Sequence, residues 1–171
     1  MSDRKTFRRL AVVLGICVLG SFGSPRLLGQ ATPGVYELSF QSTRGEIVST
    51  LPICTQSVCE ELILKAHIED SSGVPANSGL VIFQYCSLKG LPPNDLSRPD
   101  EAPKAACESG AATWDRLVTI KVSETGDAFM DFGVVMKPRT VGFRFRYLRQ
   151  GGEIASATSL AKDFTWVAAT P

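Results

Sequence analysis

The sequence predicts an all-β protein, an antiparallel β-sandwich of about seven strands. Three observations support this prediction. Short apolar runs alternate with polar residues at a period of two, turn-forming residues separate the runs, and residues 32–171 show no helical periodicity. Two such sheets packed face to face bury the apolar sets and leave the charged sets in water.

The first 31 residues have the organisation of a secretory signal peptide. A basic segment ending at Arg9 precedes the apolar run Leu10 to Leu19, and small residues follow. The run is much shorter than the roughly 20 residues that span a bilayer as a helix, so we expect a signal-peptide helix and no stable membrane insertion after its removal. Small residues at Gly29 and Ala31 favour cleavage after Ala31, and a cut after Gly23 is the alternative. We therefore expect a secreted or periplasmic protein.

Residues 32–171 are expected to form one domain, because 140 residues are too few for two ordinary cores. They carry 13 basic and 16 acidic side chains, a net charge of −3. A mildly acidic domain lacks the basic field that nucleic-acid binding requires. We expect no nucleic-acid partner.

Four cysteines remain after the predicted cleavage, an even number in a chain sent to an oxidising compartment. Three pairings are possible. We favour Cys54 with Cys59 and Cys86 with Cys107, because each pair brackets a polar or proline-rich segment that resembles a loop. The spacing contains no CxxC motif, so disulfides are favoured over a metal site.

The first half of the domain contains four expected strands. Two opening strands are expected at Tyr36 to Phe40 and at Glu46 to Leu51. The third, from about Glu61, alternates regularly and places one set of residues inward: Leu62, Leu64, Ala66 and Ile68. A turn over Asp70 to Gly73 leads to the fourth strand, Gly79 to Cys86, whose expected inward residues are Val81, Phe83 and Tyr85.

The second half contains four more runs. Leu117 to Val122 and Ala128 to Val135 flank Thr125-Gly126-Asp127, which predicts a hairpin. Thr140 to Leu148 is the most regular strand, and its expected inward residues are Val141, Phe143, Phe145 and Tyr147. A last strand near Ser159 to Ala168 is expected to bury Leu160, Phe164 and Trp166.

One segment does not fit a strand pattern. Ser87 to Thr113 contains four prolines and few large apolar residues. It is longer than a compact fold tolerates unless the segment is functional or tethered. We predict a long loop tethered by the Cys86 to Cys107 bridge.

The stretch Leu62 to Tyr85 resembles the first half of bacterial immunoglobulin-like (Big-type) domains, in which a D-x-x-G-x-P turn leads to a small residue and a V-x-F strand. The matching positions are Asp70, Gly73, Pro75, Gly79, Val81 and Phe83. Gly126 to Phe132 and Thr140 to Tyr147 resemble the family's second half. The resemblance implies an immunoglobulin-like sandwich in a secreted, single-domain version. By analogy it also implies binding or adhesion.

Motifs of known catalytic or cofactor sites are absent from the sequence, including GxSxG, Walker and HExxH motifs. His67 is the only imidazole and lies in mid-strand, where a solvent-facing side chain is the simplest interpretation. We expect no enzymatic activity, no cofactor and no metal.

Two groups of residues are candidates for binding. The first is the tethered loop with the tryptophan beside it: Leu91, Pro92, Pro93, Asn94, Asp95, Arg98 and Trp114. The second is an arginine row that could hold an anion: Arg144, Arg146 and Arg149.

The leading hypothesis is a non-enzymatic binding or adhesion domain that contacts another protein through the Cys86–Cys107 loop, since loops on a rigid sandwich carry recognition. One alternative is a small carbohydrate-binding module that uses Trp114. Another is a protease-inhibitor-like protein that presents the proline-rich segment around Pro92 to Pro99. The sequence is compatible with a protein or a glycan partner.

Overall fold

The computed structural model describes residues 31–55, 59–88 and 101–169 of the 171-residue chain. The predicted signal peptide lies outside the described residues except for Ala31. The described part contains nine strands and one short helix, in this order: β1 (Gly34–Ser42), β2 (Thr50–Pro52), β3 (Leu62–Asp70), β4 (Leu80–Ser87), α1 (Lys104–Glu108), β5 (Thr113–Lys121), β6 (Asp127–Gly133), β7 (Arg139–Leu148), β8 (Ala157–Thr158) and β9 (Lys162–Val167).

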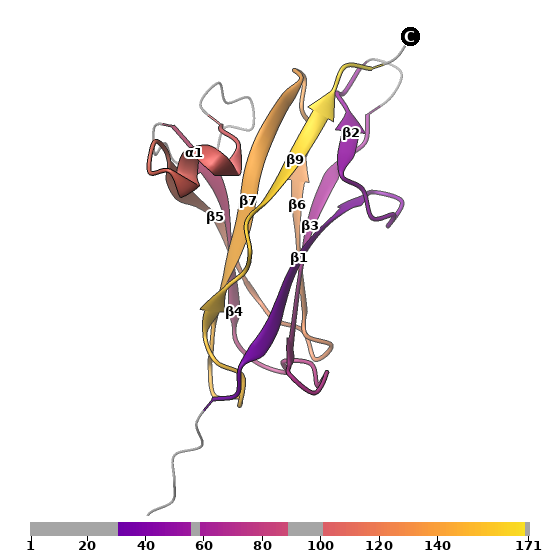
Figure 1. The fold of residues 1–171 in the computed structure, drawn as a ribbon. Coiled ribbons are helices and arrows are strands. Elements are labelled where there is room, and N and C mark those ends of the chain that lie inside the picture. The colour runs from indigo at the N-terminus through magenta and orange to yellow at the C-terminus, as the bar shows by residue number, and fades with distance from the viewer. Residues whose placement is uncertain (1–30, 56–58, 89–100, 170–171) are drawn as a thin grey trace, which may run out of the picture.

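The strands form two sheets that face each other (Figure 1). The smaller sheet has the order β1-β3-β6, and the larger has the order β2-β9-β7-β4-β5 with β8 added to β7. This confirms the expected all-β sandwich. All but one of the strand pairings are antiparallel, as expected; β2 and β9 pair in parallel. The short strand β8 was not expected.

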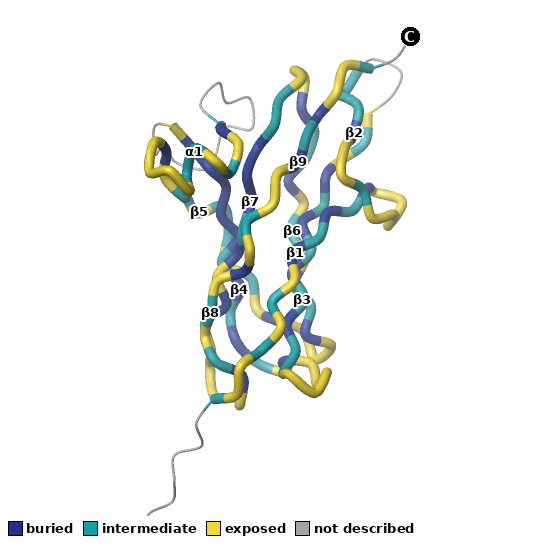
Figure 2. The backbone as a smooth tube through the Cα atoms, in the orientation of Figure 1, coloured by how far each residue is buried: buried dark blue, intermediate teal, exposed yellow. Residues whose placement is uncertain are grey.

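The core lies between the two sheets, and buried residues, dark blue in Figure 2, recur along the strands that enclose it. In β3 the alternating residues predicted to face inward are all fully buried. Phe143 of β7 contacts Phe40 of β1 and Phe132 of β6, with ring centroids 5.8 and 5.0 Å apart. Aromatic rings therefore interlock the two sheets. The inward positions predicted for β4 and β7 are also confirmed.

The prediction for Leu160 is wrong, because this side chain is 83% exposed. Leu160 lies between β8 and β9. The preceding residue, Ser159, is buried instead, and its hydroxyl accepts a hydrogen bond from the backbone N–H of Phe145 at 3.0 Å. That bond fixes the phase of the connection and turns Leu160 outward. The other two residues predicted to be inward, Phe164 and Trp166, are buried.

The predicted hairpin around Gly126 is also wrong. The two flanking strands belong to different sheets, because β5 pairs with β4 and β6 pairs with β3. Gly126 has a φ of +78°, and its carbonyl accepts a hydrogen bond from the N–H of Ile68 in β3. A Cβ at Gly126 would lie 2.4 Å from the Ile68 carbonyl oxygen. The turn thus passes close to β3 and carries the chain from one layer to the other.

The Ser87–Thr113 segment is not a loop throughout, because α1 forms within it and its ends belong to β4 and β5. None of the helices in the described ranges has the length and hydrophobicity required to cross a bilayer.

Both favoured disulfides are confirmed, with Cα atoms 4.3 Å apart in Cys54–Cys59 and 5.9 Å apart in Cys86–Cys107.

Candidate functional site

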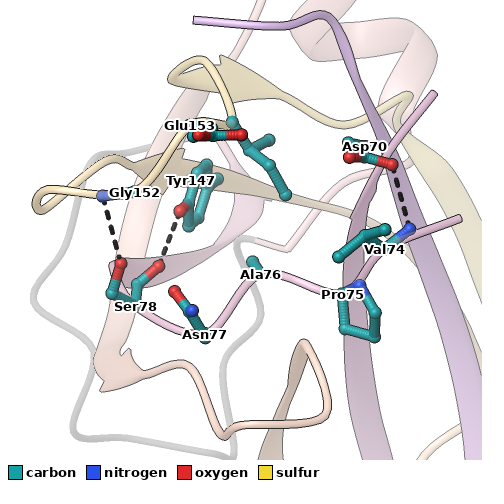
Figure 3. A pocket seen from close by; sticks show the side chains of 10 residues that line it. Asp70, Val74, Pro75, Ala76, Asn77, Ser78, Tyr147, Gly152 and Glu153 are labelled. Carbon is teal, nitrogen blue, oxygen red and sulfur yellow. Dashed lines mark hydrogen bonds between the residues drawn. The ribbon is translucent and has the colours of Figure 1, made fainter. Parts of the chain in front are cut away.

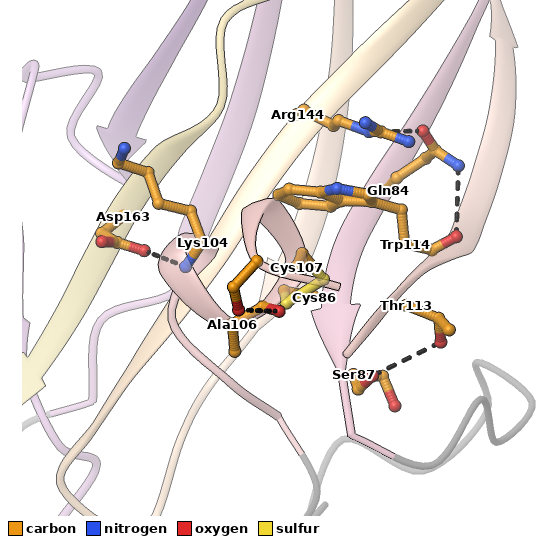
Figure 4. Close-up of a disulfide and its surroundings, with 11 residues drawn as sticks. Gln84, Cys86, Ser87, Lys104, Ala106, Cys107, Thr113, Trp114, Arg144 and Asp163 are labelled. Atoms are coloured by element: carbon orange, nitrogen blue, oxygen red, sulfur yellow. Dashed lines mark hydrogen bonds between the residues drawn. A yellow bond between two sulfur atoms is a disulfide. The ribbon is translucent and has the colours of Figure 1, made fainter. Parts of the chain in front are cut away.

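Helix α1 lies on the outer face of the larger sheet and is held there by the Cys86–Cys107 bridge (Figure 4). Cys86 stands near the end of β4, and its backbone carbonyl accepts a hydrogen bond from Ala102 at 3.0 Å. The Ala102 carbonyl in turn accepts one from Gly142 of β7 at 2.9 Å. At the start of the helix, the N–H of Lys104 donates to the Asp163 carboxylate at 2.7 Å. These contacts fix the described end of the long segment to three strands.

Beside this bridge, the structure brings together one residue from each of the two predicted binding groups. The Arg144 guanidinium stacks over the Trp114 indole, 4.4 Å from the ring centroid. Gln84 links them, because it accepts a hydrogen bond from Arg144 Nε at 2.9 Å and donates to the Trp114 carbonyl at 3.4 Å (Figure 4). The three side chains come from β7, β5 and β4, and form a small rigid unit.

Trp114, the residue that the carbohydrate-binding alternative depends on, is only half-exposed, within β5. Arg144 covers one side of its ring, and the ring packs against the small buried cluster around the disulfide, formed by Cys86, Ala102 and Ala112. Figure 4 shows the indole between Arg144 and the disulfide. The indole therefore offers its edge rather than an open face.

Four basic residues point outward from neighbouring strands of the larger sheet. We call this set the cationic face: Arg116, Lys121, Arg144 and Arg146. Residues paired across adjacent strands share a face, and Gln84 pairs with both Arg116 and Arg144. In the next rows Ile82 pairs with Arg146, and Leu80 pairs with Lys121. No acidic residue occupies an outward position of the described strands β4, β5 and β7.

Arg116 and Lys121 were missed in the sequence because the phase of β5 changes within the strand. The pairing of β4 with β5 is irregular between Phe83 and Gln84, where β5 contributes one extra residue, Leu117. This β-bulge puts Arg116 and Lys121 on the same face although they are five positions apart. Simple alternation places them on opposite faces.

Arg149 does not belong to the cationic face. It follows the end of β7, and its Nε donates to the Gly151 carbonyl at 3.1 Å. Burial and the nearby Tyr36 raise the pKa of the inward-facing Tyr147, and the charge of Arg149 offsets only part of that rise. Arg149 is two positions after the inward-facing Tyr147 and an odd number of positions from Arg144 and Arg146, so it is out of phase with the cationic face. The predicted loop residues from Leu91 to Arg98 lie outside the described residues.

His67 lies on the outer face of the smaller sheet in a cluster of charges. Its Nδ1 is 2.7 Å from the Asp127 carboxylate and its Nε2 is 3.3 Å from that of Glu69. Lys65 Nζ is 3.2 Å from the same oxygen of Asp127. Partial burial acts to raise the pKa of Asp127, but the hydrogen bonds and charges of His67 and Lys65 outweigh it, so the pKa lies below its usual value. The arrangement is a half-buried ion network.

A cavity of about 230 Å³ lies at the end of the sandwich away from α1, between the β3–β4 connection and the chain that follows β7 (Figure 3). Its polar groups serve the local structure. The Tyr147 hydroxyl donates to the Ser78 carbonyl at 2.6 Å, and one Asp70 oxygen accepts the N–H groups of Ser72 and Val74 within its turn. Since these groups already have partners, this cavity is a weaker binding candidate than the cationic face.

Comparison of the chain with protein-family models, curated proteins and solved structures found no match. The geometry of the site therefore carries the functional argument. The outer face of the larger sheet offers guanidinium and ammonium groups, a fixed indole edge and a disulfide-held helix. Such a surface can bind an anionic or mixed polar and apolar partner.

Proposed function

We propose that the protein is an exported, non-enzymatic, immunoglobulin-like domain that binds a protein partner through the surface around the Cys86–Cys107 bridge. This contact surface consists of helix α1, Trp114 and the cationic face. The observation that carries the proposal is the Arg144, Trp114 and Gln84 unit, which holds recognition groups rigidly next to a disulfide-bound segment. A rigid surface loses little entropy on binding.

Two features support export, and a third supports the immunoglobulin-like type. Two disulfides are typical of oxidising compartments, and the basic and apolar leader is typical of secreted proteins. The D-x-x-G-x-P motif forms a turn in which Asp70 caps backbone N–H groups and Gly73 has a φ of +84°. The turn joins strands of two different layers, as a sandwich of this type requires.

The same geometry favours a protein partner over a sugar. A sugar-binding aromatic platform needs an open ring face, and the Trp114 ring is covered by Arg144 on one side and packs on the disulfide cluster. Arg and Trp are both enriched in protein interfaces. The inhibitor alternative depends on Pro92 to Pro99, which lie outside the described residues.

Site-specific photo-cross-linking in the producing cell tests the proposal. A cross-linking residue is placed at Ala105 or Glu108, both exposed on α1. The control positions are Ser71 and Glu124, which are exposed in the β3–β4 and β5–β6 connections, at the end of the sandwich away from α1 (Figure 1). We expect a discrete adduct with another protein from the α1 positions and none from the control positions. Equal yields from both ends would contradict a dedicated contact surface.

A glycan array separates the carbohydrate alternative. We expect no saturable glycan binding by the oxidised protein. Saturable binding that disappears in Trp114→Ala, with the thermal unfolding midpoint unchanged, would replace protein contact with sugar recognition as the function.

A further inference from the structure

We infer that the partner of the cationic face is an extended acidic protein segment whose carboxylates recur at every second residue. This inference rests on the proposed function and specifies the chemistry of its partner. It follows from the spacing, the unbalanced charge and the fixed orientation of the basic side chains in the larger sheet.

The spacing of the arginines matches that of an extended chain. Arg144 and Arg146 are two residues apart on β7 and share its outer face, so their attachment points lie about 7 Å apart. Alternate side chains of any extended peptide recur at the same interval. Arg116 lies across β4 in the same row as Arg144, about 10 Å away at ordinary strand spacing. A strand-like peptide laid along β7 can therefore present successive carboxylates to Arg144 and Arg146, with Arg116 at its flank.

The charge of this face is not balanced within the described part of the molecule. Arg116, Lys121 and Arg146 form no ion pair with any described residue, in contrast to Arg44, which pairs with Glu60 at 3.0 Å. The domain after residue 31 is nevertheless acidic overall, at −3. Partial burial, followed by the charge of Arg146, lowers the pKa of Arg144. A bound carboxylate would relieve the repulsion between these two guanidinium groups.

Arg144 is already oriented for such a ligand. Its Nε is occupied by Gln84 and its plane rests on Trp114, which leaves the two terminal nitrogens as donors. Guanidinium binds a carboxylate through two parallel hydrogen bonds, and restraining its rotamers in advance reduces the entropy lost on binding.

The neighbouring apolar groups favour a protein over a simple polyanion. Leu80, Ile82 and Leu148 are half-buried and lie in the same rows as Lys121 and Arg146. Alternating apolar and charged contacts suit a polypeptide, which can supply both. A highly charged polysaccharide would leave these apolar groups without complementary contacts.

The test uses fluorescein-labelled 12-residue peptides and fluorescence anisotropy with the oxidised full-length protein. One peptide alternates Glu and Thr, a second has the same composition in Glu-Glu-Thr-Thr blocks, and a third alternates Lys and Thr. We expect the alternating Glu peptide to bind tighter than the block peptide, and its affinity to fall with added salt. We expect the Lys peptide not to bind.

Paired variants locate the site. Arg116 and Arg146 are both exposed, and we expect the double variant Arg116→Gln with Arg146→Gln to bind the alternating Glu peptide about tenfold more weakly or worse. Arg144→Gln should lower the affinity for this peptide by a similar factor, although it also unstacks Trp114. The control is Lys137→Gln with Lys162→Gln, which removes the same charge from exposed positions elsewhere and should change binding less than about twofold. Unfolding midpoints of all variants confirm that each is folded.

Equal effects of the two double variants, equal affinity for both Glu peptides, or tighter binding to heparin than to the alternating peptide would each overturn the inference. The proposed function is tested separately. If cross-links persist at α1 while the acidic peptides fail to bind, the contact surface stands and its acidic specificity is wrong. If cross-links at α1 are absent, the contact surface itself is wrong.

Discussion

Gly79 makes possible a close contact between the chain leading into β4 and the end of β7. Its φ is +120°, and a Cβ there would lie 2.4 Å from the Tyr147 ring. The Tyr147 hydroxyl reaches past it to donate to the Ser78 carbonyl at 2.6 Å. The glycine of the G-x-V-x-F pattern is thus required both by its backbone angle and by the tyrosine packed on it.

Gly79→Ala should lower the free energy of unfolding by about 2 kcal/mol or more, because it adds a clash to the strain of a positive φ. Tyr147→Phe should cost about 1 kcal/mol, the usual contribution of one hydrogen bond. Urea denaturation measures both. The control is Gly151→Ala, at a φ of +91° with open space around it, which isolates the backbone strain. If Gly79→Ala costs no more than this control, the tight contact with Tyr147 is wrong.

Asp127 connects β6 to the ion network on the smaller sheet. Partial burial acts to raise the pKa of Asp127, but the hydrogen bonds and charges of His67 and Lys65 together lower it by more. The pKa in the folded protein therefore lies below the unfolded value. The carboxylate therefore stabilises the fold above the unfolded pKa of about 3.9, and that contribution disappears as the pH falls through the lower, folded value.

We expect the urea midpoint of the wild-type protein to fall as the pH is lowered from 5 toward 2, and Asp127→Asn to reduce the steepness of this fall. The physical reason is that the variant has no proton to bind at this site. Glu124→Gln, at an exposed position in the preceding turn, is the matched control and should retain the wild-type slope. Identical slopes for Asp127→Asn and wild type would contradict the role of this carboxylate.

At the scale of elements, the docking of helix α1 on the larger sheet depends on a glycine in β7, the strand that the helix covers. Gly142 interrupts the bulky residues of β7, and a Cβ there would lie 2.4 Å from the backbone nitrogen of Lys104. The missing side chain lets the helix lie directly on the sheet. The contact between α1 and Gly142 could not be predicted from the sequence. A helix of five residues is too short to show helical periodicity, and Gly142 is more than 30 positions away.

Gly142→Ala should displace α1 while leaving the sandwich folded. We expect faster amide exchange at Ala105 to Glu108 and faster reduction of the Cys86–Cys107 bridge, because the added methyl group meets backbone that cannot rotate away. Hydrogen exchange followed by mass spectrometry measures the first effect, with the β3 amides as the internal control. Unchanged exchange in α1 would show that the helix is not docked through Gly142.

The long strands β3, β4 and β7 and their buried faces were predictable, and the short strand β8 and the connections between strands were not. Period-two alternation in β3, β4 and β7 depends only on local pleating, so the inward residues followed from the sequence. The Gly126 turn looks the same locally whether it closes a hairpin or joins two layers. The position of Arg116 depends on a bulge, and the covered ring of Trp114 depends on Arg144 from another strand. Each of these is set by contacts distant in sequence.

At the scale of the whole molecule, one core serves both sheets. Phe40 of the smaller sheet packs on Phe143 and Phe164 of the larger, and Phe132 packs on Trp166. Because neither sheet buries its apolar face alone, we expect the domain to unfold in one cooperative transition. The two disulfides act on this same equilibrium by restricting the unfolded chain.

Replacing Cys86 and Cys107 together by Ala should lower the free energy of unfolding by about 3 kcal/mol, and replacing Cys54 and Cys59 by Ala should lower it by about 2 kcal/mol, since the second pair closes a shorter loop. Guanidinium denaturation followed by tryptophan fluorescence and by circular dichroism measures both changes. Coinciding transitions are expected from the two probes in each variant. Separate transitions would show that the larger sheet and the smaller sheet are independent units.

The place of β9 in the larger sheet also constrains how the chain reaches this structure. β9 comes last in sequence among the strands, yet it lies inside the sheet, parallel to β2 on one side and antiparallel to β7 on the other. The β2 to β9 pairing joins residues more than 100 positions apart, which raises the contact order and slows folding. As the chain emerges from a ribosome, β2 has no partner strand among the described strands until β9 has emerged. Closure of the larger sheet must therefore follow the appearance of residues 162–167.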